Sequence, residues 1–210
     1  MTSSDVPRLR CGRRSFAALS SDPAAASWES LNAQHLQENS GCAEPRLATT
    51  VRASWNDAAW HLLFECEDPH PWATITERDG PLWIEEVVEV FFDPVGDLQS
   101  YFEIEVNPLN TVCDLVLRRS PSGWRKEFAW HCGGLSTSVQ RTPHGWNAEL
   151  QIPFAEVTNA PVRAGTVWRG NFFRIDRPKG AGTAADLSAW SPTFAPTFHR
   201  PGRFGVIEFC

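Results

Sequence analysis

The chain has 210 residues, a formal net charge of −6 at pH 7 and 42% hydrophobic residues. A chain of this length buries a core large enough to fold without disulfides or metal, and it is short for two domains. Its Lys and Arg residues are scattered, which argues against nucleic acid as a partner, because that needs a clustered basic face. No apolar stretch reaches the length of a transmembrane helix, so we expect no membrane partner.

Aromatic residues dominate the composition, with ten Trp and thirteen Phe against one Tyr and one Met. Tryptophan serves both in a sandwich core and as a flat platform for a sugar ring, so the count favours both uses. The six cysteines have no C-x-x-C spacing and no histidine at metal-ligand spacing, so we predict no metal site of the zinc type. Their even number allows disulfides, but we favour reduced thiols.

The first 26 residues are rich in Ser, Ala and Arg and have no hydrophobic periodicity. We therefore expect a loosely ordered lead-in over 1–26, followed by one domain over 27–210. The apolar run at 15–19 is too short and too polar for a signal peptide, so the sequence favours a cytoplasmic protein unless a leader is absent from this chain. A short helix or turn is expected over 28–38.

From residue 49 onward, short β-rich runs alternate with turns that contain Gly, Pro and Asn. The pattern predicts about nine strands: 49–55, 60–67, 87–93, 101–107, 111–117, 135–141, 146–152, 168–176 and 203–209. One helical turn is expected over 153–157, because proline suits the start of a helix. Without recurrent helices a parallel α/β sheet is excluded, and we predict an all-β, antiparallel, jelly-roll-like sandwich. Long loops at 68–82 and 177–200 are the expected place for binding.

A tryptophan directly precedes the strand predicted over 87–93. Trp83 follows a Gly-Pro-Leu approach, and on the strand Val87, Glu89 and Phe91 share one face. Glu89 is therefore a carboxylate flanked by apolar neighbours within a sheet, and such a group needs a partner or a ligand. The residues alone favour neither an ion pair across the strands nor a ligand contact.

Four segments, in order, resemble the family 9 carbohydrate-binding modules. Trp83 with the run E-E-V-V-E-V-F-F-D over 85–93 is similar to the family's W-x-x-D-x-V-E-I-F-I-D pattern. The strand F-E-I-E-V-N over 102–107 resembles its F-R-V-N strand. The stretch G-W-N-A-E-L-Q-I-P-F over 145–154 is similar to G-W-x-x-E-x-x-I-P-F, and F-H-R-P-G-R-F-G over 198–205 to W-R-D-P-x-x-F-G. Together the segments span about residues 45–210.

The resemblance implies non-catalytic binding of a mono- or oligosaccharide, including a chain end, between two aromatic side chains. The aromatic positions fall on Trp83 and Phe198, and the polar strand positions on Glu89 and Asn107. The chemistry is sound, because an aromatic ring covers the apolar face of a pyranose while carboxylates and amides bond to its hydroxyls. The ordinary alternative for both rings is packing or loop anchoring.

Two departures from the family pattern bear on the sugar preference. Phe198 stands in place of a Trp, and Glu105 stands where the family has a sugar-binding Arg. We expect Arg174 or Arg200 to supply the missing donor from a neighbouring segment. His199 is a further candidate for contact with a ligand hydroxyl, although such a histidine more often bonds to a loop carbonyl.

The resemblance also implies a setting for the protein. Such modules normally tether an enzyme to its polymer, so we expect a separate glycoside hydrolase as a working partner, and an extracytoplasmic location if the chain follows the family. We predict no cofactor. Some relatives hold structural calcium, which needs clustered oxygen ligands. The candidates here are dispersed along the chain and leave that question open: Asp68, Asp79, Asp93 and Asp97.

Three other functions remain as alternatives. A glycoside hydrolase would use two carboxylates of the set at 85–105 at a controlled separation, and Glu89 and Glu105 are the pair expected on adjacent strands. A haem-binding electron-transfer sandwich would need two histidine ligands, because the one methionine is Met1. A protein-interaction sandwich would use Trp83 as a partner anchor.

Overall fold

The computed structural model describes residues 6–16, 18–25 and 27–210. Nearly all regular structure in this part of the chain is β. The strands are β1 (Arg8–Arg13), β2 (Gln34–His35), β3 (Gln37–Glu38), β4 (Thr49–Trp55), β5 (Ala59–Glu67), β6 (Val87–Asp93), β7 (Ser100–Val106), β8 (Val112–Ser120), β9 (Gly123–Glu127), β10 (Ser136–Thr142), β11 (Gly145–Pro153), β12 (Val167–Asp176), β13 (Asp186–Ala189) and β14 (Gly205–Phe209). The helices are η1 (Leu82–Ile84), α1 (Phe154–Val157) and η2 (Pro201–Arg203). The predicted all-β class is confirmed.

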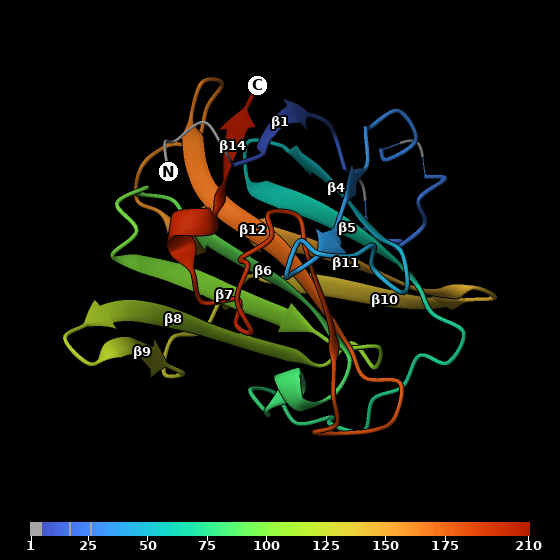
Figure 1. The fold of residues 1–210 in the computed structure, drawn as a ribbon. Helices are drawn as coiled ribbons and strands as arrows, with labels where there is room; N and C mark the ends of the chain where they lie inside the picture. The colour runs from blue at the N-terminus through green and yellow to red at the C-terminus, as the bar shows by residue number, and fades with distance from the viewer. Residues whose placement is uncertain (1–5, 17, 26) are drawn as a thin grey trace.

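The strands form a curled sheet that folds into two layers (Figure 1). One layer has the order β10-β11-β5-β4, and the other has the order β14-β12-β6-β7-β8-β9. β1 lies between β4 and β14 and joins the layers. The nine predicted strands are all present, with ends that differ from the expected ones by no more than three residues.

The first strand corrects two expectations. β1 pairs in parallel with β14, where Leu9 is opposite Ile207, and in parallel with β4, where Gly12 is opposite Ser54. The sheet is therefore mixed and not purely antiparallel. Residues 8–13 are also not loosely ordered, because Leu9 and Cys11 are buried while the arginines between and beside them face solvent. The remainder of the expected lead-in includes residues 1–5, 17 and 26, which lie outside the described residues.

Other differences concern short, polar segments. Of the helix or turn expected over 28–38, the structure shows the turn, followed by the two-residue strands β2 and β3, which were not expected. β9 and β13 were not expected, because they are four or five residues long and mostly polar. Each is held by a longer neighbour: β9 extends the β8 hairpin, and β13 pairs with β12. No described helix is both long and apolar enough to cross a bilayer.

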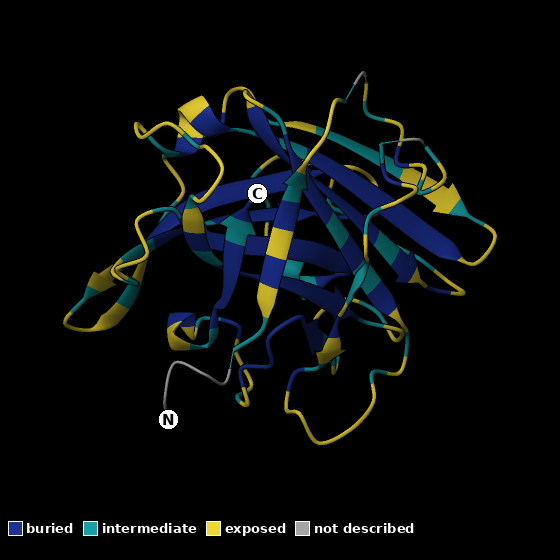
Figure 2. Ribbon diagram, turned by 90° about the horizontal axis from the view of Figure 1, so that it is seen from above, coloured by how far each residue is buried: buried dark blue, intermediate teal, exposed yellow. Residues whose placement is uncertain are grey.

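β6 is buried on both faces, and this positions the functional site. Val88, Val90 and Phe92 pack into the core between the layers. Val87 and Phe91 point the opposite way, into a second apolar cluster on the outer face of the same layer. η1, β13 and the segment that leads to η2 cover this second cluster. Figure 2 shows the strands as mostly buried, whereas the loops at the rim are exposed.

Candidate functional site

A cavity of about 410 Å³ opens on the outer face of the β6–β9 part of the sheet. It brings together five of the predicted site residues, from η1, β6, β7 and the loop before η2: Trp83, Glu89, Glu105, Phe198 and His199. Segments more than a hundred residues apart in the chain therefore converge at one place. The cavity also contains Glu103, Lys126 and Arg177, which we did not predict.

Three carboxylates form the floor of the cavity. Glu89 on β6 is directly opposite Glu105 on β7, and Glu103 lies two residues before Glu105 on the same face. One oxygen of each lies within 4.8 Å of the others. Glu89, Glu103 and Glu105 are 3%, 1% and 0% exposed. Neither carboxylate oxygen of Glu105, nor Oε2 of Glu103, has a hydrogen-bond partner among the described residues.

Burial and mutual repulsion make these carboxylates hard to ionise. Burial raises the pKa of Glu89 well above its usual range, and the neighbouring Glu103 raises it further. The pKa of Glu105 is raised in the same way, by burial and then by Glu89 and Glu103. The ammonium of Lys126 opposes the shift, because its Nζ lies 3.5 Å from Oε1 of Glu103. The floor therefore retains protons above the pH at which an exposed glutamate has lost them.

Trp83 forms one wall of the cavity. It lies in η1, is partly buried and packs against the outer apolar cluster. Lys126 Nζ lies over its ring, 4.9 Å from the centroid, in a cation–π arrangement. Arg177 Nη2 donates a hydrogen bond of 3.1 Å to the Trp83 carbonyl oxygen, which fixes the backbone of η1 against the loop after β12. The tryptophan ring is thus held in place at the rim.

Phe198 and His199 form the opposite part of the lining. Phe198 is stacked on Phe173 with ring centroids 4.2 Å apart and is only 6% exposed, so most of its surface is used in packing. Nδ1 of His199 lies 2.9 Å from the Tyr101 hydroxyl and 3.7 Å from Oε2 of Glu103. Burial lowers the pKa of His199 to about 4, with Lys126 adding to the effect, so the ring is neutral at pH 7.

The structure does not bring Asn107 into the cavity. Asn107 follows the end of β7, and its Oδ1 accepts hydrogen bonds from the backbone N–H groups of Leu109 and Thr111 at 3.0 and 2.9 Å. Its Nδ2 donates to the Ile75 carbonyl oxygen at 2.9 Å. The amide therefore shapes the turn between β7 and β8 and holds the 68–82 loop.

Arg174 also lies away from the cavity. It is opposite Val88, whose side chain points into the main core, and it is only 1% exposed. Nη1 donates to the carbonyl of Glu67 at 2.7 Å, and Nη2 donates to Asp68 Oδ2 at 2.8 Å. Arg200 is exposed and does not line the cavity. Neither arginine therefore replaces the sugar-binding Arg that the family has at the position of Glu105. Lys126 is the cation beside the carboxylates.

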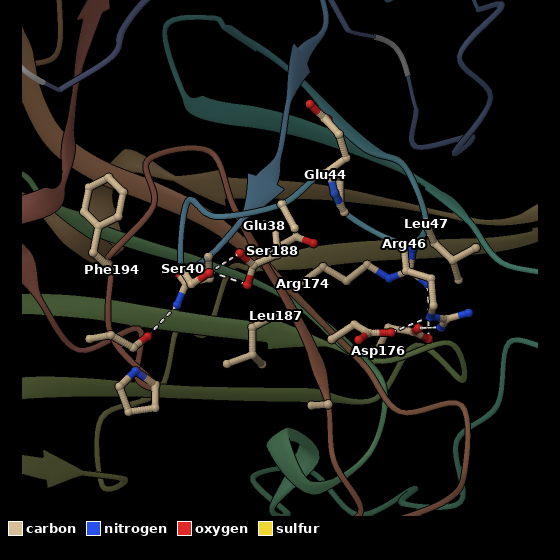
Figure 3. A pocket seen from close by; sticks show the side chains of 17 residues that line it. Glu38, Ser40, Glu44, Arg46, Leu47, Arg174, Asp176, Leu187, Ser188 and Phe194 are labelled. Carbon is tan, nitrogen blue, oxygen red and sulfur yellow. Dashed lines mark hydrogen bonds and ion pairs between the residues drawn. The ribbon is translucent and has the colours of Figure 1, made fainter.

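A second cavity of about 550 Å³ lies on the other side of β13 and is shown in Figure 3. Most of its charged groups are paired: Arg46 bonds to Asp176 and Asp186, and Ser40 bonds to Glu38. Arg174 lies beside them in the same lining. The second cavity is larger than the first, but most of its charged side chains already bond to neighbouring groups.

The carboxylates of Asp68, Glu86 and Asp176 form a second acidic cluster next to this cavity. Burial raises the pKa of Glu86 to about 8. Arg174 Nη2 contacts both aspartates, and Arg46 bonds to Asp176. Two of the three carboxylates are thus paired with guanidinium groups, whose positive charge disfavours a calcium ion at this cluster. Asp93 is used as well, because it accepts backbone N–H bonds in the turn after β6.

The sequence is similar to a known protein family and to a fungal protein. Residues 20–210 match the model of the family described as carbohydrate family 9 binding domain-like. An extracellular protein of Arthroderma benhamiae is 30% identical over 180 residues, which cover 79% of this chain and 80% of that protein.

Two solved structures share the fold. One is a family 9 carbohydrate-binding module from Caldicellulosiruptor kristjanssonii in complex with glucose, with a TM-score of 0.74 and 16% identity over 97% of this chain and 96% of that chain. The other is a family 9 module from the same organism in complex with cellotriose, with a TM-score of 0.73 and 16% identity over 97% and 93%. At this identity the likeness concerns the architecture alone.

Proposed function

The chain belongs to the carbohydrate family 9 binding domain-like family, and we propose that it binds a mono- or oligosaccharide, without catalysis, in the cavity between Trp83 and Phe198. One observation carries the proposal. A partly exposed tryptophan ring and carboxylates with free acceptor oxygens line the same cavity. An aromatic face and hydrogen-bonding groups beside it are what a pyranose ring needs.

The two rings have unequal parts in this proposal. Trp83 is the platform, because its ring is held at the rim with part of its surface open. Phe198 closes the cavity from behind, since its packing on Phe173 leaves little of the ring free. Lys126 lies over the Trp83 ring, so a sugar that stacks on that face displaces the ammonium group. Once displaced, the ammonium is free to bond to a hydroxyl of the sugar.

The placement of the carboxylates supports binding over hydrolysis. Glycosidases place two carboxyl groups on either side of the scissile bond, about 5–5.5 Å or 6.5–9.5 Å apart. Here Glu89, Glu103 and Glu105 lie on two adjacent strands, with one oxygen of each within 4.8 Å of the others. All three therefore reach a ligand from the same side, which favours hydrogen bonds to its hydroxyls over attack from both sides of a glycosidic bond.

We also propose an extracytoplasmic location and a separate glycoside hydrolase as a working partner. The extracellular fungal relative supports the location. Of the sequence-based alternatives, the family expectation is therefore preferred to the cytoplasmic one. Cell fractionation and immunoblotting of the native protein show whether it is secreted, and this tests the location independently of sugar binding.

A glycan array followed by calorimetric titration tests the binding proposal, with the variant Trp83→Ala as the decisive comparison. We expect at least a tenfold loss of affinity, about 1.4 kcal/mol, with an unchanged far-UV spectrum. Trp130→Ala is the matched control, because Trp130 is also partly buried but packs against the core on the other face of the sheet. Equal affinity of Trp83→Ala and the parent protein would place the site elsewhere.

A further inference from the structure

The two acidic clusters of this protein are neutralised in different ways. Around Asp68 and Asp176, two arginines form ion pairs with the carboxylates. In the cavity, the described residues offer the floor one ion pair with a lysine or arginine side chain, that of Lys126 with Glu103. The other cation of the lining, Arg177, donates instead to the carbonyl oxygens of Trp83 and Thr183.

Glu105 is the residue that this arrangement leaves without a partner. Its side chain is fully buried from bulk solvent, it lines the cavity, and both of its oxygens lack a hydrogen-bond partner among the described residues. A buried, unpartnered carboxylate costs free energy, which a positively charged ligand group relieves by a charge-assisted hydrogen bond. Glu105 also lies directly opposite Glu89, so the two carboxyl groups cannot both ionise without repulsion unless a cation lies beside them.

The protein itself shows which cation suits this cavity. The Lys126 ammonium lies between the face of Trp83, at 4.9 Å from the ring centroid, and Oε1 of Glu103, at 3.5 Å. An alkylammonium is therefore already accommodated between the aromatic wall and the acidic floor. The Lys126 ammonium contacts Glu103, whereas Glu105 in the same floor has no hydrogen-bond partner among the described residues.

We propose that the cavity selects a saccharide that carries a free, protonated amino group, and that Glu105 with Glu89 receives this group. The inference rests on the proposed sugar binding and specifies its ligand class. An amino sugar presents an apolar ring face to Trp83 and an ammonium to the carboxylates. A neutral sugar leaves the Glu105 carboxylate without an opposite charge.

A metal ion is the other cation that carboxylates bind, and the geometry favours it less. Calcium takes six to eight oxygen ligands, whereas this cluster offers three side chains. The Lys126 ammonium, close to one of the same carboxylates, repels a metal ion. The cavity volume of about 410 Å³ is in the range of small-molecule sites and far exceeds the need of a single ion.

The test compares three sugars of one ring geometry on the full chain: glucosamine, N-acetylglucosamine and glucose, together with short β-1,4 oligomers of each. Calorimetry is run near neutral pH, with EDTA and separately with calcium. We expect the free amine to bind about tenfold more tightly than the acetylated and neutral sugars. Acetylation removes the charge and keeps the nitrogen, so it isolates the ion pair.

Two variants and one control assign the effect to the floor. Glu105→Gln should reduce the ratio of glucosamine to glucose affinity to near one, whereas Glu127→Gln should keep the parent ratio. Glu127 carries the same charge on β9 but bonds to Arg118 and Arg125 outside the cavity. Lys126→Gln should raise the ratio, because it removes the competing ammonium. If Glu105→Gln does not fold, the three-sugar comparison on the parent chain still decides.

The outcomes separate the two proposals. If glucose binds in a Trp83-dependent way and glucosamine binds no better, the amine selectivity is wrong and the sugar site stands. Binding that appears with calcium and disappears with EDTA would mean that a metal ion fills the floor, which also overturns the selectivity proposed here. If none of the sugars binds, and the array is blank as well, the sugar-binding function itself is refuted.

Discussion

Glu89 and Glu105 face each other directly across the β6–β7 strand pair, both almost fully buried. Directly opposed like charges destabilise a strand pair, and burial adds the cost of desolvation. The pKa values of both groups are raised by burial and by the neighbouring carboxylates. The pair therefore binds protons in the folded protein that it releases on unfolding, so the stability of the free protein depends on pH.

The sign of this dependence gives the first prediction. An exposed glutamate titrates near about pH 4.3, so between that pH and the raised folded pKa the folded state holds more protons than the unfolded state. The contribution of Glu105 to stability is thus favourable in acid and is lost as the pH rises. Glu105→Gln removes the loss, and we expect a stability gain on the order of 1 kcal/mol at about pH 8 that shrinks towards about pH 5.

Urea unfolding at the two pH values measures this effect, with Glu127→Gln as the control. Arg118 and then Arg125 lower the pKa of Glu127, so that variant should not gain stability as the pH rises. His61 and His199, whose pKa values burial lowers to about 4, destabilise the protein below about pH 6.5. They do so equally in parent and variant and cancel from the comparison. A gain for Glu105→Gln that is larger in acid would contradict the assignment.

The second prediction concerns Phe198. Because its ring stacks on Phe173 and is 6% exposed, Phe198→Ala should lower the free energy of unfolding by about 3 kcal/mol as well as weaken sugar binding. Phe198→Leu should recover part of the stability and less of the affinity. Chemical denaturation and calorimetry on the same preparations separate the two losses. A variant that is as stable as the parent would mean that the ring is a free platform and not part of the packing.

The third prediction separates Arg174 from the site. Arg174→Met leaves Asp68 and Asp176 close together without their buried partner, which should destabilise the fold by about 3–5 kcal/mol. Sugar affinity, measured at a temperature at which the variant is still folded, should stay within twofold of the parent value. Arg174→Lys keeps the charge and should restore part of the stability. A selective loss of binding in a stable variant would return Arg174 to the list of ligand contacts.

The fourth prediction applies the same logic to Asn107. Its amide makes three hydrogen bonds within the turn after β7 and to the 68–82 loop. Asn107→Ala should therefore cost about 2–3 kcal/mol of stability, measured by thermal and urea unfolding, without a specific effect on sugar affinity. Hydrogen exchange should increase at Thr111, whose N–H loses its acceptor. Unchanged exchange at that position would contradict the structural role.

The floor of the site could be predicted from the sequence to a large extent. Alternation placed Glu89 on the face of 87–93 that Val87 and Phe91 share, and it placed Glu105 on the face of 101–107 away from Ile104. The expectation that the two glutamates lie on adjacent strands agrees with the register between β6 and β7. The same alternation put Glu103 beside them, although we did not name it as a site residue. Asn107 has the right parity, but the strand ends at Val106 and the chain turns before the side chain can join the face.

The remaining parts depend on long-range packing that periodicity does not report. Lys126 lies on β9, a short polar strand with no hydrophobic pattern, and it enters the cavity because the β8–β9 hairpin places it opposite Leu117. β12 is buried on both faces, so composition could not tell that Arg174 points into the core and that Phe173 points towards the cavity. The parallel pairing of β1 with β14 likewise joins two strands that are far apart in the sequence, and periodicity does not report such a pairing.

The seam formed by β1 has a consequence for how the protein folds. Residues 8–11 pair with residues 206–209, which lie 198 positions later in the sequence. Until β14 is in place, β1 and β12 each keep an unpaired border, and such borders recruit foreign strands. Contacts this distant in sequence form slowly. The docking of β14 thus closes the sheet, and a variant in which β14 cannot pair would keep open borders that attract other strands.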